Sequence, residues 1–202
     1  MDANALLQLF RNLPEGLQIV LGLYGIMLVI RLIDWIIFRD GMINRFGLRG
    51  MRAPKGNHFL AWILNPFIHL NWRHLWSNSV GWLPMATIIA LLDTQEFLLA
   101  TAVIIIIGNL GLWLFEKGNV VTAGASGMIT GYFGFLLLRG FFTRDTTAVI
   151  IGFVMLAVYY SLLRLIFIPQ KGNVSNVGHF FGFLGGVAAA WLWSFILPQP
   201  FQ

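Results

Sequence analysis

The chain has 202 residues, of which 58% are hydrophobic and only 10% are charged, and its mean hydropathy is +0.78. Soluble domains carry roughly 25% charged residues, so this composition excludes a soluble globular protein and makes lipid part of the solvent. The net charge of +5 would favour nucleic-acid binding in a soluble protein. Here the basic residues cluster just outside hydrophobic segments, where lipid headgroups explain them better, and no nucleic-acid partner is expected.

Six stretches qualify or nearly qualify as membrane-spanning helices, which need about 20 mostly apolar residues. In chain order they cover about residues 17–38, 69–92, 97–115, 123–142, 146–168 and 177–197. The sequence shows no internal repeat and no second domain. It therefore predicts an all-α membrane protein, with a single domain over residues 1–202 built as a bundle of six transmembrane helices.

The first predicted membrane helix and the connection after it contain polar residues that need an explanation. Residues 1–15 do not read as a cleavable signal, so the first segment is expected to be kept as a membrane helix. Arg31 and Asp34 interrupt this segment three residues apart, and we expect them to pair on one helix face. The following connection, about residues 39–67, is long and mixes basic, glycine, proline and apolar residues, a composition suited to the interface plane.

Polar residues gather at the starts of the second, fourth and sixth segments. If the six helices alternate in direction, these three starts lie on the same side of the membrane, within a layer about 10 Å thick. Ionisable groups in a bilayer are costly and by default mark a functional site. The residues concerned are His69, His74, Asn78, Gly124, Ser126, Gly127 and His179.

Glycine spacing indicates which helices touch. Glycines recur every three or four residues along one face of the fourth segment and one face of the sixth, a pattern that lets backbones approach closely. They are Gly127, Gly131 and Gly134 in the fourth segment, and Gly178, Gly182 and Gly186 in the sixth. Packing of these two faces would bring Ser126 and His179 side by side.

A serine hydroxyl beside an imidazole is the arrangement needed for nucleophilic catalysis. Ser126 needs a neighbouring base to take its proton, and His179 is the only candidate base in the two helices. No carboxylate lies near His179 in the sequence, so a Ser–His dyad is predicted, with Asn176 as a residue that would orient the imidazole.

Acyl transfer also needs donors aimed at the developing oxyanion. His74 and Asn78 are four residues apart, share one helix face and can supply side-chain donors, together with the backbone N–H of Ser126. His69 does not share that face and would act from just before the helix.

These residues resemble the rhomboid intramembrane serine proteases over about residues 65–190. The likeness lies in three motifs: His69-Leu70-Asn71-Trp72-Arg73-His74-Leu75-Trp76-Ser77-Asn78, then Gly124-Ala125-Ser126-Gly127, then Gly178-His179-Phe180-Phe181-Gly182 with Gly186. Members of that family often carry an aromatic residue four positions after the nucleophile, where this chain has Thr130.

The resemblance implies a six-helix bundle with a water-filled cavity open to one side. It implies Ser126 as nucleophile, His179 as general base, and His74, Asn78 and the Ser126 backbone as oxyanion donors, with no cofactor. Substrates would be transmembrane segments of other membrane proteins, cut near the outer membrane face. The expected location is a cell membrane, the inner or plasma membrane of a bacterium, with the active site facing outward. The Lys and Arg distribution points the other way, because it places the first connection in the cytoplasm.

Two further readings use the same residues. The chain could be a catalytically inactive relative that binds and escorts transmembrane helices, although such relatives typically lack the Ser or the His. It could also hold a metal through His69, His74 and His179, but the spacing is not H-E-x-x-H, and the absence of cysteine excludes thiolate ligands. No metal is therefore expected. A transporter is disfavoured because the polar residues sit at one end of the bundle. The sequence does not specify the substrate or the oligomeric state.

Overall fold

The computed structural model describes residues 3–117, 120–168 and 175–196. The described chain is mostly helical, which confirms the all-α prediction. The elements are α1 (Ala3–Arg11), α2 (Glu15–Ile33), η1 (Asp34–Phe38), α3 (Met42–Phe46), β1 (Leu48–Arg49), α4 (Ala61–Leu64), α5 (Trp72–Leu92), α6 (Thr94–Phe115), β2 (Val121–Thr122), α7 (Ser126–Thr143), α8 (Thr146–Val158), α9 (Ser161–Phe167) and α10 (Asn176–Ile196).

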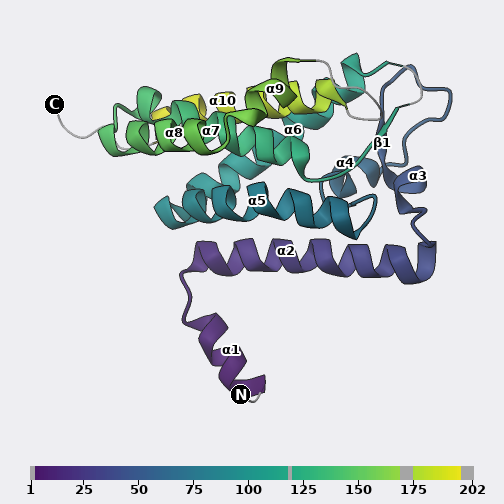
Figure 1. Cartoon of the computed structure of the whole chain (residues 1–202), viewed down its shortest axis with the longest axis horizontal. Coiled ribbons are helices and arrows are strands. Elements are labelled where there is room, and N and C mark those ends of the chain that lie inside the picture. Colours follow the sequence, from purple (N-terminus) through teal and green to yellow (C-terminus); the bar gives the residue numbers. More distant parts are fainter. Residues whose placement is uncertain (1–2, 118–119, 169–174, 197–202) are drawn as a thin grey trace.

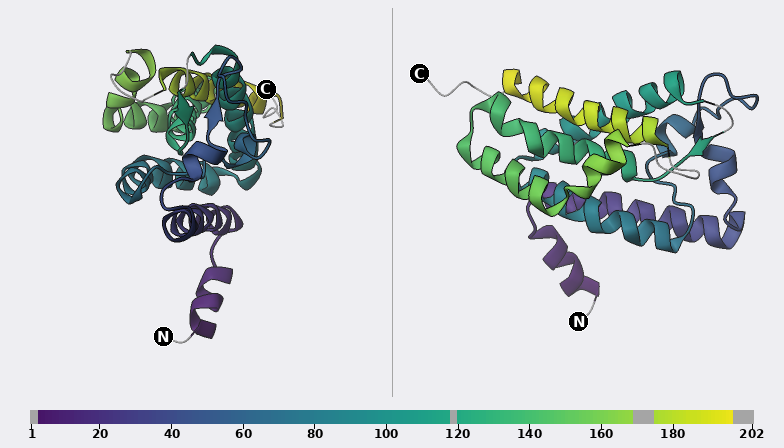
Figure 2. Two further views of the ribbon diagram at one scale, coloured as in Figure 1. Left: turned by 90° about the vertical axis from the view of Figure 1, so that its right-hand side faces the viewer. Right: turned by 45° about the horizontal axis from the view of Figure 1, so that its top comes forward.

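The long helices lie side by side with their axes roughly along one direction (Figures 1 and 2). Helix α2 covers one side of α5, while α6, α7 and α10 form the opposite part of the bundle. Helix α1 projects away from the bundle. Helices α5, α7 and α10 all begin at the end of the bundle where α3 and β1 lie, as the alternating arrangement predicts.

Four helical segments are long and apolar enough to cross a membrane: Glu15–Phe38, Trp72–Leu92, Thr94–Phe115 and Asn176–Ile196. The predicted fifth span is broken, because Thr146–Val158 and Ser161–Phe167 meet at an angle of 82° and count as one span only if the bent pair is taken together. The predicted count of six is roughly consistent with this, since the bent pair taken as one span gives five and α7, which is not among the spans apolar enough by themselves, would be the sixth. The predicted sixth segment extends to residue 197, which lies outside the described residues.

Helix α7 is the most enclosed of the long helices, and it packs against α10 through glycine. A Cβ atom added to Gly182 would lie 2.2 Å from the Gly127 carbonyl oxygen, and one added to Gly186 would lie 1.8 Å from the Gly131 carbonyl oxygen. These separations leave no room for a side chain, so the two backbones are in direct contact. The predicted packing of the two glycine faces is confirmed.

Helix α2 is fixed to α5 by both polar and aromatic contacts. The Tyr24 hydroxyl lies 2.9 Å from the Ser79 hydroxyl, and the Tyr24 ring stacks on Trp82. At the end of α2, Arg31 Nη1 lies 2.7 Å from Asp34 Oδ2, which confirms the predicted pairing on one helix face. The last turn of this long helix is the π-helix η1.

The long first connection lies across one end of the bundle. It contains α3, β1 and α4, and β1 pairs antiparallel with β2, with Leu48 opposite Thr122 and Arg49 opposite Val121. The sequence did not predict this strand pair, because two residues are too few to show an alternating pattern. The pairing joins the first connection to the segment that leads into α7, and so to Ser126.

Candidate active site

Ser126 and His179 meet at the start of two helices. Ser126 is the first residue of α7, His179 lies in the first turn of α10, and the Ser126 Oγ is 2.9 Å from the His179 Nε2. The His179 side chain is buried, while Ser126 is half-buried. The structure therefore brings together the two residues that the sequence singled out, at hydrogen-bond distance and with the imidazole largely shielded from solvent.

Thr130 fixes the backbone that carries the imidazole. Its hydroxyl, which is fully buried, lies 2.9 Å from the His179 carbonyl oxygen and 3.0 Å from that of Gly127. Thr130 is thus a bridge between α7 and α10 one turn below Ser126. The sequence offered a signal for this role, since Thr130 follows Ser126 by four residues and shares its helix face.

His74 and Asn78 face Ser126 from the first two turns of α5. Asn71 caps this helix, its Oδ1 accepting a hydrogen bond from the His74 N–H at 2.8 Å. His74 Nε2 lies 3.3 Å from Asn78 Nδ2, so the two side chains meet as their spacing predicts.

Gly124 packs directly against these two side chains. It has a φ of +120°, which favours glycine, and an added Cβ would lie 2.8 Å from His74 Cε1. A larger residue at this position would push the turn before Ser126 away from α5.

His69 is buried just before α5 and touches the turn that leads to Ser126. Its Nδ1 lies 3.1 Å from the Phe67 carbonyl oxygen, and its Nε2 accepts a hydrogen bond from the Ala125 N–H at 3.4 Å. A carbonyl only accepts hydrogen bonds, so the ring proton sits on Nδ1 and the imidazole is neutral. Burial is the main cause that lowers the pKa of His69 from 6.5 to about 4, and electrostatic interaction with neighbouring His74 and with the Arg31 cation lowers it further.

Asn65 supports the same turn through its backbone. Its carbonyl oxygen accepts a hydrogen bond from the Gly124 N–H at 2.8 Å, and its side chain donates to Asn109 Oδ1 at 2.8 Å. Two successive N–H groups, those of Gly124 and Ala125, are therefore held by the segment before α5. Sequence reasoning missed Asn65, because a backbone acceptor leaves no residue-type signal.

A cavity of about 560 Å³ opens beside Ser126. It is lined by His74, Ser126 and His179, and by amides such as Asn65 and Asn109. A second cavity of about 240 Å³ is also lined by Ser126 and is bounded by α5 and by the break between α8 and α9. Ser126 lines both cavities.

The prediction that Asn176 orients the imidazole is wrong. The Asn176 amide lies at the start of α10 and donates to the carbonyl oxygen of Ile168 at 2.8 Å, at the end of α9. Within the described residues, His179 Nδ1 is buried without a hydrogen-bond partner. Proximity in sequence misled here, because Asn176 and His179 are only three residues apart but the amide turns toward the end of α9.

The histidines do not gather as a metal site. His69 and His74 are neighbours, with ring centroids 5.3 Å apart, while His179 pairs with Ser126. In the part of the chain that the structure describes, no group of three His, Cys, Asp or Glu residues is placed to hold a metal ion.

Comparison with known proteins places the chain in a family. The Rhomboid domain matches residues 56–195. An uncharacterized protein of Mycobacterium tuberculosis strain H37Rv is 35% identical over 184 residues, which cover 87% of this chain and 74% of the relative. A protein of Bacillus subtilis with the name "Putative rhomboid protease YdcA" is 27% identical over 192 residues, covering 88% of this chain and 93% of the relative. No solved structure matches the chain significantly. From the family match and the identity to its relatives, this chain belongs to the rhomboid family.

Proposed function

We propose that this chain is an intramembrane serine endopeptidase that cleaves transmembrane segments of other membrane proteins. One observation carries the proposal: the Ser126 hydroxyl lies 2.9 Å from His179 Nε2 beside a cavity of about 560 Å³. This distance permits direct proton transfer from the hydroxyl to the ring nitrogen. Membership of the rhomboid family supports the same reaction class.

In the proposed reaction, Ser126 Oγ attacks the carbonyl carbon of the scissile peptide bond while His179 Nε2 takes its proton. The tetrahedral intermediate collapses when the same imidazole returns that proton to the leaving amine, giving an acyl-enzyme. Water from the cavity then attacks the ester, with His179 again as the base, and Ser126 is regenerated.

The proposed oxyanion site follows from the hydrogen bonds of His74. The Leu70 N–H donates to His74 Nδ1 at 3.4 Å, which leaves the ring proton on Nε2. That N–H then lies beside the Nδ2 amide of Asn78, with Nε2 and Nδ2 3.3 Å apart, so two donors are adjacent and neither can accept from the other. An oxyanion beside both groups would accept from each, and the Ser126 backbone N–H at the start of α7 supplies a third donor.

The substrates in this proposal are membrane proteins, because the second cavity opens between α5 and the α8–α9 break. A segment approaching Ser126 by this route passes Tyr159, whose hydroxyl donates to the Val80 carbonyl oxygen at 3.2 Å across the gap. We further propose that the protein lies in the bacterial cell membrane with this end of the bundle facing outward.

Labelling with a serine-reactive fluorophosphonate tests the proposal most simply. The wild-type protein in detergent is expected to be labelled, and Ser126→Ala is expected to abolish the label. His179→Ala should lower the labelling rate by at least about 100-fold, because the hydroxyl loses its base. Ser194→Ala, at the far end of α10, serves as the matched control and should label as the wild type does.

The same experiment separates the protease from an inactive relative that only escorts transmembrane helices. A protein without an activated serine would not react faster than free serine. Labelling that persists in Ser126→Ala, or a wild-type protein that is inert to the probe, would contradict the proposed function.

A further inference from the structure

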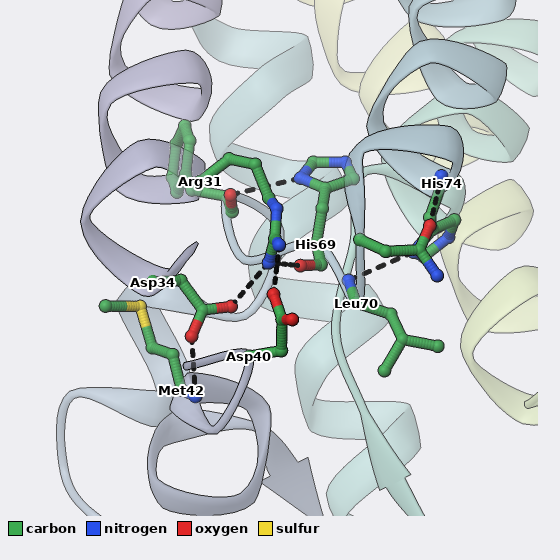
Figure 3. Close-up of polar contacts among 9 residues, drawn as sticks. Arg31, Asp34, Asp40, Met42, His69, Leu70 and His74 are labelled. Carbon is green, nitrogen blue, oxygen red and sulfur yellow. Dashed lines mark hydrogen bonds and ion pairs between the residues drawn. The ribbon is translucent and has the colours of Figure 1, made fainter. Parts of the chain in front are cut away.

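Arg31 is a buried cation on the first membrane helix, well away from the Ser126–His179 pair in the sequence. Its side chain is 1% exposed and forms ion pairs with Asp34 and Asp40 (Figure 3). Asp34 in turn accepts a hydrogen bond from the Met42 N–H at 2.9 Å through its other oxygen. A charge buried this deeply is retained only when its partners compensate the lost hydration, and here two carboxylates do so.

The chain must turn sharply to bring Asp40 back to Arg31. Arg39 and Asp40 both have positive φ, of 51° and 64°, directly after the π-helix η1. Non-glycine residues adopt this conformation at a cost, and single π-turns often occur at functional sites. The ion pair between Arg31 and Asp40 holds this turn in place.

Arg31 also reaches the peptide group that precedes His74. Its Nη1 donates to the His69 carbonyl oxygen at 3.3 Å, and the N–H of the same peptide unit, that of Leu70, donates to His74 Nδ1 at 3.4 Å (Figure 3). A peptide unit is planar, so fixing its carbonyl also fixes the direction of its N–H. A line of hydrogen bonds therefore runs from Arg31 through one peptide plane to the His74 ring.

We propose that Arg31 is a positioning residue for the oxyanion site, acting through the His69–Leu70 peptide to keep the His74 proton on Nε2. In this tautomer His74 presents an N–H beside Asn78, where the proposed reaction develops negative charge. The inference rests on the proposed protease function for its kinetic consequence. The tautomer itself is independent of that function.

A second contact ties the same region to the nucleophile. Arg31 binds the backbone carbonyl of His69, and the ring of the same residue accepts a hydrogen bond from the N–H of Ala125, one residue before Ser126. A shift of His69 would therefore move both the His74 proton and the start of α7. Misplacement of catalytic groups by as little as 1 Å can cost about 100-fold in rate.

The kinetic test uses Arg31→Met, which keeps much of the side-chain volume and removes the donors. Cleavage of a model transmembrane substrate in liposomes should show kcat lowered between about 10-fold and 100-fold with KM within about twofold of wild type. Asp40 is half exposed, so Asp40→Asn should fold normally and lower kcat by a smaller factor. Arg31→Lys, which restores one charged donor, should recover part of the loss.

Arg139→Met is the matched control. Arg139 is also a buried cation paired with two carboxylates, Glu96 and Asp145, but it lies near the C-terminal end of α7, which is at the opposite end of the bundle from the start of that helix (Figure 1). Its loss should lower the melting temperature at least as much as Arg31→Met and leave kcat within about twofold. The inference is overturned if Arg31→Met and Asp40→Asn keep the wild-type kcat, or if Arg139→Met lowers kcat to the same extent.

Nitrogen-15 NMR of labelled histidine tests the inference without any activity. The chain has four histidines, so their signals are few. In the wild type, His69 should show its proton on Nδ1 and His74 on Nε2, and Arg31→Met should shift the His74 signals toward a mixed population. Unchanged His74 signals would refute the role of Arg31 even in an active enzyme. The expected shift in a protein that cleaves nothing would leave the inference standing and reject the proposed function alone.

Discussion

The three histidines near Ser126 differ in what faces their ring nitrogens. His69 Nδ1 faces a carbonyl, His74 Nδ1 faces a backbone N–H, and His179 Nδ1 is buried with no partner among the described residues. These surroundings fix different protonation patterns on chemically identical rings. A neutral His69 can only support the turn before Ser126, whereas His179 Nε2 is free to exchange a proton with the hydroxyl.

The buried neutral state of His69 predicts a pH dependence of stability. Its pKa is about 4 in the folded protein, against the ordinary value of 6.5 that applies to the unfolded chain, so the unfolded chain binds more protons between these limits. The contribution of neutral His69 to the free energy of unfolding is therefore fully present above about pH 6.5. It is lost as the pH drops toward 4, and the loss is on the order of 3 kcal/mol. Thermal denaturation in detergent at a series of pH values measures this slope.

The variant His69→Gln should reduce that slope, because Gln cannot bind the proton that destabilises the fold. His58→Gln is its control, since His58 is exposed in the long first connection. Equal slopes in wild type and His69→Gln would show that His69 does not contribute to the acid sensitivity.

Thr130→Val tests the bridge between α7 and α10. Valine has nearly the same shape but removes the hydroxyl that donates to the His179 carbonyl, so we expect a loss of about 0.5–1.5 kcal/mol in the free energy of unfolding. The rate of fluorophosphonate labelling should fall with it, because His179 is less firmly placed. Thr147→Val, at an exposed position in α8, should change neither quantity. A stable Thr130→Val protein with wild-type labelling would exclude this role.

At the scale of elements, the α7–α10 contact determines whether Ser126 and His179 meet. The two helices approach so closely that backbone carbonyls of α7 occupy the space where side chains of Gly182 and Gly186 would lie. In lipid the hydrophobic effect does not drive helices together, and close packing through small residues is one of the attractions that does. The glycine faces are thus as necessary for the site as the polar residues.

Gly186→Ala should separate the helices. Its Cβ would lie 1.8 Å from the Gly131 carbonyl oxygen, and we expect at least about 1–3 kcal/mol of destabilisation with loss of serine labelling. Gly22→Ala in α2 is the control, because nothing lies within 4 Å of its added Cβ and alanine favours a helix. Melting temperatures in detergent compare the two. A Gly186→Ala protein as stable as Gly22→Ala would contradict the contact described here.

On the scale of the whole molecule, two polar groups lie at opposite ends of the bundle. One is the site with Ser126, and the other is the cluster in which Arg139 pairs with Glu96 and Asp145, joining α6, α7 and the start of α8. The long first connection covers only the first of these ends. Whether the end with Ser126 or the end with Arg139 faces outward therefore determines the side of the membrane on which substrates would be cut.

Accessibility of introduced cysteines measures this orientation directly, since the chain has no cysteine of its own. We expect Lys55→Cys, in the long connection, to react in intact bacterial cells with a membrane-impermeant maleimide. Arg144→Cys, in the turn after α7, should react only after the membrane is opened. Both positions are exposed at the protein surface. The reverse pattern would favour the orientation that the Lys and Arg distribution predicts.

The helical architecture and the meeting of Ser126 with His179 were predictable because each follows from local periodicity. Hydropathy located the long helices, and glycine spacing identified the α7–α10 contact. The 82° break between α8 and α9 was not predictable, since Tyr159 and Tyr160 lack the proline or glycine that would signal it. Arg31 and Asp34 were recognised as a pair, but their link to His69 depends on a turn with positive φ at Arg39 and Asp40, which no residue preference indicates.

Cleavage of a transmembrane substrate in liposomes by matched proteins tests the central claim most directly. Wild-type protein should release a product whose formation stops in both Ser126→Ala and His179→Ala, while both variants retain the wild-type melting temperature within a few degrees. Cleavage that continues at the wild-type rate in either folded variant would contradict the assignment of the Ser126–His179 dyad.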